Sequence, residues 1–208
     1  AASVNVQEIT AWLCTALTRI AERRYGAAPG LALQFQLESC RLRLEACAEV
    51  HAARVRDGWR IVAAEHASRH ALTVAGVPVT ARIDRIDQRG SEVQILDYKT
   101  GAAQDPVTAS YQRGAWVDLQ LPLYVHSVAA SGAYKGCTLA AGYFNVPSST
   151  DKCEIITAAW THDDLAAALA TAEEVVRTMT AHAPGTFQRT QDRAVCASCE
   201  YCHLCQRV

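Results

Sequence analysis

The sequence lacks the features that mark a membrane protein or a secreted one. No apolar run reaches the roughly 18 residues that a membrane-spanning helix needs. The first residues, Ala-Ala-Ser-Val, are neither a basic segment followed by an apolar stretch nor a lipidation motif. We therefore expect a cytoplasmic protein without membrane contact. The chain also begins without Met, so we expect it to be a piece of a longer protein.

An excess of one charge and a glycine-rich phosphate loop are also missing. There are 20 Lys and Arg residues against 21 Asp and Glu residues, so the net charge is -1. This total gives no support for nucleic-acid binding, although a local basic stripe would be enough for it. Without the glycine-rich loop we expect no ATP binding. Hydrophobic residues make up 50% of the 208 positions, which excludes a mainly disordered chain.

Cysteine, in contrast, is abundant and clustered. The chain has nine cysteines, and four of them fall in its last thirteen residues. An odd count without a secretion signal does not fit a disulfide scaffold, so we expect reduced thiols and a metal site at the C-terminus. Zn²⁺ and a [4Fe-4S] cluster both take four thiolates, and the repeated two-residue spacing is closer to a ferredoxin-type run. The four residues are Cys196, Cys199, Cys202 and Cys205.

Hydrophobic periodicity predicts helices at the start, strands in the middle and a mixed remainder. The expected helices span 6–25, 31–56, 108–130 and 161–183, the last capped by Thr161 and the third kinked or restarted at Pro122. The expected strands span 59–65, 81–87, 92–98, 137–146 and 153–159, with a further hairpin over 71–79.

This order of elements predicts an α/β fold in which a mixed β-sheet is flanked by helices. We expect one domain in three parts, because neither a repeat nor a long linker divides the chain. Residues 1–58 form a helical part, residues 59–185 form the core, and residues 186–208 form a Cys-rich tail packed on the same domain.

Acidic residues and a lysine are expected to meet at one end of the sheet. A turn at residues 88–91 allows two strands to pair, so that Asp84 and Asp97 lie side by side. Asp97 and Lys99 are two apart on one strand and project to the same face. Two carboxylates can hold Mg²⁺ or Mn²⁺, and a neighbouring lysine can orient or deprotonate water or stabilise developing charge. Glu65, at the end of the preceding strand, could add a third carboxylate.

A non-catalytic interpretation is that Asp97 and Lys99 form a solvated ion pair on a strand. The apolar Ile95-Leu96 before Asp97 and the Thr-Gly after Lys99 favour a buried strand end instead. Arg82 and Arg85 lie near the expected site and could contact phosphates of DNA. The alternative for both arginines is a solvated strand face.

Three motifs occur in order: Arg-Ile-Asp84, then Asp97-Tyr98-Lys99, then Gln120-Leu-Pro-Leu-Tyr124. With them the chain resembles the PD-(D/E)XK nuclease superfamily, and within it the nuclease domains of the RecB and AddB helicase–nuclease subunits. The resemblance covers about residues 55–205 and implies a restriction-endonuclease-like core, a metal-dependent DNA exonuclease activity, and a helicase subunit or domain as partner. It also implies that Asp84 and Asp97 bind Mg²⁺ or Mn²⁺, that Lys99 is catalytic, and that Gln120 and Tyr124 line the DNA-binding side.

Two departures from the family's pattern bear on activity. A family glycine is replaced by Ala81, and a Gly-x-x-x-His motif whose His helps to bind metal is missing. His51 lacks the glycine, so we expect it to be a surface helix residue and the motif to lie upstream of this chain. An impaired nuclease, an inactive nuclease-fold scaffold, and an iron–sulfur or zinc DNA-binding module are therefore the alternatives.

The tail also resembles a family feature, Cys-x-x-Cys followed after five residues by Cys, with a fourth ligand far upstream. Cys196, Cys199 and Cys205 fit that spacing. Cys202 is then an extra thiol or the substitute fourth ligand. The remaining candidates for a fourth ligand within this chain are Cys14, Cys40 and Cys47. The resemblance implies that such a cluster would staple the tail to the core.

Overall fold

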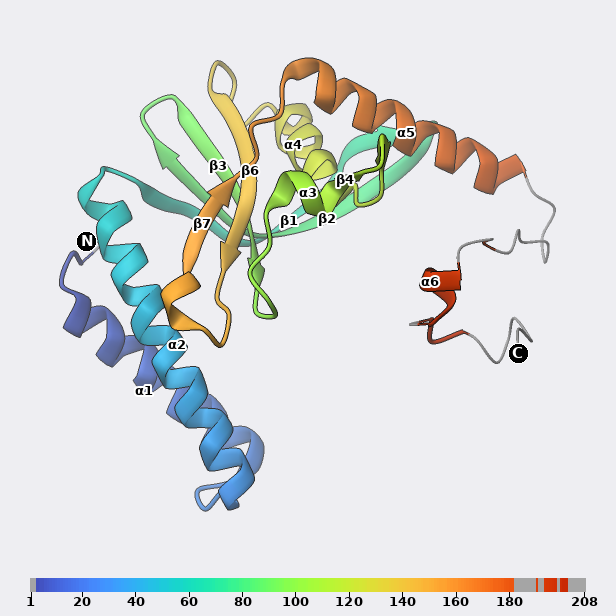
Figure 1. The fold of residues 1–208 in the computed structure, drawn as a ribbon. Coiled ribbons are helices and arrows are strands. Elements are labelled where there is room, and N and C mark those ends of the chain that lie inside the picture. Colours follow the sequence, from blue (N-terminus) through green and yellow to red (C-terminus); the bar gives the residue numbers. More distant parts are fainter. Residues whose placement is uncertain (1–2, 182–189, 191–192, 198, 202–208) are drawn as a thin grey trace.

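A curled five-stranded sheet lies at the centre of the computed structural model, which describes residues 3–181, 190, 193–197 and 199–201 (Figure 1). The strand order is β1-β2-β3-β6-β7, with β3 and β6 parallel and the other neighbours antiparallel. This confirms the predicted mixed sheet flanked by helices. The helices are α1 (Val6–Tyr25), α2 (Leu31–Arg56), α3 (Pro106–Ser110), α4 (Gln120–Ser131), the 3-10 helix η1 (Thr150–Lys152), α5 (His162–Ala181) and α6 (Arg193–Ala197). The strands are β1 (Arg60–Val74), β2 (Val77–Arg89), β3 (Glu92–Lys99), the short pair β4 (Tyr111–Gln112) and β5 (Ala115–Trp116), β6 (Thr138–Asn145) and β7 (Glu154–Thr157).

The two N-terminal helices begin and end where the sequence predicts. The Asn5 side chain accepts hydrogen bonds from the backbone N–H groups of Gln7 and Glu8, which caps α1. Asp57 ends α2, and Gly58 follows with a φ of 92°, a conformation that glycine adopts without strain. The chain then enters β1 directly.

Strands β1 and β2 form one long antiparallel hairpin. The hairpin predicted over 71–79 is confirmed and turns at Ala75-Gly76, but the strand expected to end at Glu65 continues to Val74. Pairing runs along most of the hairpin and is interrupted by shifts in register, one of them next to Ile61. Glu65 has a φ of 49°, so the regular alternation of side chains is also broken there. These irregularities are compatible with the curl of the sheet.

The helix predicted over residues 108–130, kinked or restarted at Pro122, is confirmed only in its second half: the chain forms α3, a small hairpin and then α4. Asp105 caps the short α3, and Pro106 occupies its first position. Gly114, with a φ of 83°, makes the tight turn between β4 and β5. Pro122 is the third residue of α4, where its missing N–H breaks no intrahelical hydrogen bond. A helix can therefore restart just before it.

The last described elements of the core agree with the sequence pattern. Strands β6 and β7 lie within the two predicted ranges. The Thr161 hydroxyl accepts a hydrogen bond from the backbone N–H of Asp164, whose carboxylate accepts one from the Thr161 N–H. This reciprocal cap starts α5, as predicted.

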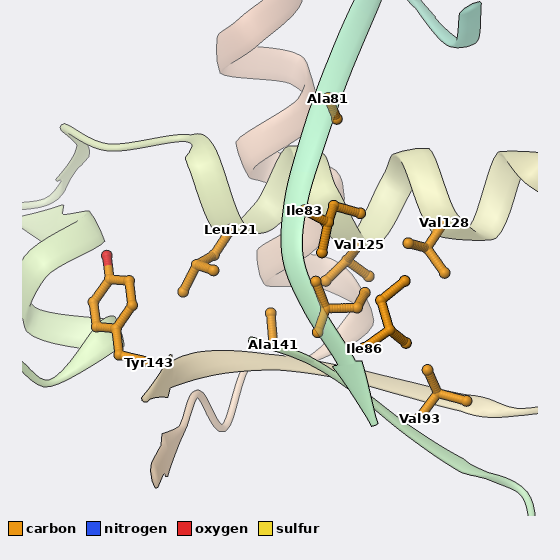
Figure 2. Packing of buried hydrophobic residues seen from close by; sticks show 10 residues of the cluster. Ala81, Ile83, Ile86, Val93, Leu121, Val125, Val128, Ala141 and Tyr143 are labelled. Atoms are coloured by element: carbon orange, nitrogen blue, oxygen red, sulfur yellow. The ribbon is translucent and has the colours of Figure 1, made fainter. Parts of the chain in front are cut away.

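The two faces of the sheet carry different helices. On one face, Val93 and Ile95 of β3 belong to the hydrophobic core that includes Leu121 and Val125 of α4. Figure 2 shows these α4 side chains directed toward the strands. On the other face, Gln94 of β3 accepts a hydrogen bond from α2. Because alternate residues of a strand face opposite ways, the next odd-numbered positions of β3 also face α4.

Gly142→Ala is expected to lower the free energy of unfolding by about 1–3 kcal/mol, because a Cβ there would overlap backbone of the neighbouring strand. It would collide with the Ile156 carbonyl oxygen and lie 2.9 Å from Thr157 Cα. Urea denaturation measures the change. Gly101→Ala is the matched control, since a Cβ there has open space. Equal stability of the two variants would show that β6 and β7 can separate without cost.

None of the helices in the described part of the chain is long and apolar enough to cross a membrane.

Candidate active site

Asp97 and Lys99 form the centre of the site, at the end of β3 where the strand meets α4. Both face α4, as their two-residue spacing predicts. Lys99 Nζ lies 2.8 Å from Asp97 Oδ2, and the side chains are only 21% and 8% exposed. Lys99 Nζ also lies 4.6 Å from the ring centroid of Tyr143, the residue of β6 that pairs with Asp97. The pair is therefore largely buried, unlike a solvated surface ion pair.

Asp84 joins them from the adjacent strand. Arg85 of β2 pairs with Leu96 of β3, so Asp84 lies one step further along, next to Asp97. The Asp84 carboxylate accepts a hydrogen bond of 3.0 Å from the backbone N–H of Tyr98. Two carboxylates and one ammonium group thus meet at one strand end, which is the juxtaposition that the sequence predicts.

Gln120 and Tyr124 connect this cluster to the first turns of α4. Lys99 Nζ donates to Gln120 Oε1 at 3.4 Å, and Gln120 Nε2 donates to the Tyr124 hydroxyl at 3.1 Å. The Tyr124 hydroxyl in turn donates to the backbone carbonyl of Arg82 at 2.9 Å. The four-residue spacing on a helix places both side chains on one face, and the hydrogen bonds fix that face against β2 and β3.

Asp118 is a further acidic residue of the site that the sequence interpretation missed. It is half-buried, and its carboxylate accepts a hydrogen bond of 2.8 Å from the backbone N–H of Gln120. Its negative charge acts on Asp97 and on Lys99. An Asp two residues before a helix start was the available signal, because such residues commonly satisfy free N–H groups there. That signal indicates a cap and carries no information about the sheet that the cap faces.

Burial and mutual charge shift the pKa values of the central pair. Burial raises the pKa of Asp97, with the carboxylates of Asp84 and Asp118 adding to the effect and Lys99 opposing it. Burial lowers the pKa of Lys99, but its hydrogen bond to Asp97 and the Asp97 charge outweigh burial, so the net pKa is raised. Lys99 is therefore protonated beside several closely spaced carboxylates. A bound divalent cation would reduce the repulsion between these carboxylates.

Glu65 and Arg82 lie at the exposed side of the β1–β2 hairpin. Glu65 Oε2 and Arg82 Nε are 2.5 Å apart, and the side chains are 61% and 75% exposed. Because it pairs with this arginine, Glu65 is not among the contacts that join Asp84, Asp97 and Lys99. The carboxylate of Glu65, expected to be the third metal ligand, is therefore paired with Arg82 at the exposed side of the hairpin.

Arg85 lies on the opposite face from Asp97 and is buried. Its guanidinium donates to both oxygens of Asp87 and to the Tyr98 hydroxyl. His51 of α2 is half-buried beside it, with Nδ1 3.4 Å from Arg85 Nη2. Burial and the Arg85 charge lower the pKa of His51. The structure therefore separates Arg85 and His51 from the acidic cluster.

The chemistry of the acidic cluster fits a small divalent cation. Carboxylate oxygens are the ligands that Mg²⁺ and Mn²⁺ prefer, and Mg²⁺ is commonly held by one or two carboxylates together with water and substrate phosphate. Asp84 and Asp97 would supply those two carboxylates. Among the described residues, no group of three or more His, Cys, Asp or Glu side chains is arranged to hold a metal without further ligands.

The cysteine tail is described only in part. The backbone N–H of Cys199 donates to the Cys196 carbonyl at 3.3 Å, at the end of α6. Cys202 and Cys205 lie outside the described residues. Of the three cysteines considered as upstream ligands, Cys47 lies against Cys153 of the core. A Zn²⁺ or [4Fe-4S] site in the tail thus stays a prediction.

Comparison with known proteins supports the assignment that this geometry suggests. The profile of the PD-(D/E)XK nuclease superfamily matches residues 4–206, nearly the whole chain. No curated protein matches the chain significantly. A sheet end that unites two aspartates and a lysine agrees with the motif after which that superfamily is called. The chain belongs to the PD-(D/E)XK nuclease superfamily.

Proposed function

We propose that the chain is a Mg²⁺- or Mn²⁺-dependent deoxyribonuclease, the exonuclease domain of a RecB/AddB-like repair and recombination protein. The observation that carries the proposal is the meeting of Asp84, Asp97 and Lys99 at the end of β3, linked to Gln120. A helicase subunit, or a helicase domain of the same protein, is the proposed partner, by similarity to the RecB and AddB subunits.

Each side chain has a role that its position supports. Asp84 and Asp97 would hold the cation, which would supply Lewis acidity to activate water and to offset phosphate charge. The Lys99 ammonium group stabilises the negative charge that develops on the phosphate or orients the attacking water. Gln120 and Tyr124 keep Lys99 and α4 in register with the strands. Arg82, exposed at the rim, is placed to contact a DNA phosphate.

Two of the residues first considered for this site have different positions in the proposal. Arg85 is not part of the proposed DNA contact surface, because its guanidinium is buried against Asp87. Glu65 is the ion-pair partner of Arg82. A DNA phosphate that binds Arg82 would displace Glu65. The proposed contact surface therefore includes Arg82 and leaves out Arg85.

Linear duplex and single-stranded DNA are expected to be degraded by the chain in Mg²⁺ or Mn²⁺ and to stay intact in EDTA, because the two aspartates need a cation to bind phosphate. End-labelled DNA resolved on gels measures the products. Covalently closed circular DNA is the matched control, which an exonuclease leaves intact. Cleavage of the circle at the same rate would overturn the exonuclease assignment. Intact linear DNA with either metal, also in a chain extended at its N-terminus, would overturn the nuclease proposal and favour a scaffold.

A further inference from the structure

Two cysteines from distant parts of the sequence lie against each other outside the candidate active site. Cys47 is on α2, and Cys153 lies directly between η1 and β7, 106 residues later. Their Sγ atoms are 3.8 Å apart, and both side chains are partly exposed. A disulfide needs an S–S distance of about 2.0 Å, so the sulfur atoms have to approach by less than 2 Å. Side-chain rotation of this size needs little movement of the backbone.

The surroundings of the pair favour one thiolate and one thiol. The hydrogen bond with Cys47 lowers the pKa of Cys153, helped by the Arg43 charge and opposed by burial and by Glu49 and Glu154. The same hydrogen bond, together with burial, raises the pKa of Cys47. Because its pKa is lowered, we expect Cys153 to be the sulfur that reacts first with peroxide.

Arg43 connects this pair to the strand end that carries the site. It lies one turn before Cys47 on α2, and its Nε donates to the Val146 carbonyl at 2.9 Å. Its guanidinium also donates to the Thr100 carbonyl, directly after Lys99. Because Val146 N–H in turn donates to the Lys99 carbonyl, α2 holds the ends of β3 and β6 together. A covalent bond at Cys47 would fix this contact.

We infer that Cys47 and Cys153 are an oxidisable dithiol, in which hydrogen peroxide converts the two thiols to a disulfide between α2 and the segment before β7. The Cys153 thiolate attacks one peroxide oxygen, which breaks the O–O bond, gives a sulfenic acid and releases hydroxide. The Cys47 sulfur then attacks the sulfenic sulfur, forms the S–S bond and releases the second oxygen as water. Two thiols lose two hydrogens, and one peroxide becomes two waters. The inference does not depend on the proposed nuclease activity.

Hydrogen peroxide can reach the pair from solvent. Cys47 lines a cavity of about 570 Å³ together with Trp12, His51 and Tyr98. Cys153 is itself partly exposed. Access does not therefore require α2 to leave the sheet.

Peroxide titration of the whole chain, followed by alkylation, trypsin digestion and mass spectrometry, tests the inference. Cleavage after Arg43, Arg54, Lys152 and Arg177 puts Cys47 in peptide 44–54 and Cys153 in peptide 153–177. We expect a cross-linked species of these two peptides that has lost two hydrogens, at peroxide doses that leave the Cys40 peptide alkylated. The oxidised chain should also melt about 5–10 °C higher, and dithiothreitol should reverse the shift.

Single serine variants test the roles of the two sulfurs. In Cys47→Ser, dimedone should trap a sulfenic acid on Cys153, whereas Cys153→Ser should give little adduct on Cys47. Cys40→Ser, on the same helix, is the matched control and should keep the cross-link and the Tm shift. Separate alkylation of both peptides at doses that oxidise Cys40 would overturn the inference. Sulfinic acid at Cys153 without any cross-link in the unaltered chain would overturn it as well.

Discussion

Lys99→Ala is expected to reduce the rate of DNA cleavage by about 100- to 1,000-fold. It removes the ammonium group that is proposed to stabilise negative charge on the scissile phosphate of DNA. Lys99 Nζ is held at 2.8 Å from Asp97 and 3.4 Å from Gln120, so its position is fixed before substrate binds. No other lysine can replace it, since Lys135 lies in a turn and Lys152 lies in η1, both outside the site. Initial rates on linear DNA at saturating Mn²⁺ measure the loss.

Lys135→Ala is the matched control for this variant. Lys135 is exposed in the turn before β6, and β6 begins beside Glu92, at the far end of β3 from Lys99. Its removal should leave the cleavage rate unchanged. Lys99→Arg separates charge from shape, because it keeps the cation but changes its reach. Wild-type rates for Lys99→Ala, in protein shown to be folded by thermal denaturation, would show that Lys99 has no part in cleavage.

The helices and most strands could be predicted because local chemistry determines them. Asn5 and Thr161 cap their helices with their own side chains, and Gly58 ends the turn after α2. The first half of the helix predicted over 108–130 is wrong because apolar spacing alone does not distinguish one long helix from two short ones separated by a hairpin. Gly114 was the visible breaker, and Pro122 marked the restart rather than a kink.

The alternation of side chains along a strand predicts the central part of the site. It does not predict the positions of Asp118 and Glu65. Asp97 and Lys99 share a face because they are two apart on one strand, and the turn sets Asp84 beside them. Asp118 joins them only through the path of the β4–β5 hairpin, which no local pattern indicates. Glu65 shows the opposite case, since its φ of 49° interrupts the alternation on which its expected position depended.

A buried ionic network on the opposite face of the sheet could not be recognised from the sequence. Asp87 is fully buried and accepts hydrogen bonds from Arg54 of α2 and from Arg85 of its own strand. Arg54 also donates to Gln94 of β3, and its guanidinium lies over the Trp59 ring. Charged side chains in a strand usually indicate a solvent face, so this face appeared exposed from the sequence. The network instead joins α2 to both strands that carry the site aspartates.

Asp87→Asn is expected to lower the free energy of unfolding by about 3–5 kcal/mol, because it leaves two nearly buried arginines without their carboxylate. The side chains of Arg54 and Arg85 are only 12% and 5% exposed, so water cannot replace the lost partner. Asparagine keeps the volume of the side chain, which assigns the loss to charge and hydrogen bonding rather than to a cavity. Urea denaturation followed by circular dichroism measures the change.

An exposed ion pair and a triple variant complete this test. Glu92→Gln breaks the Arg89–Glu92 pair, whose side chains are 44% and 51% exposed, and should cost less than about 1 kcal/mol. Replacing Arg54, Arg85 and Asp87 together by apolar residues should recover much of the stability, since no buried charge is then left unpaired. If Asp87→Asn is too unstable to isolate, the triple variant still provides the comparison. A loss for Asp87→Asn no larger than that for Glu92→Gln would show that water reaches the network and that it does not hold α2 to the sheet.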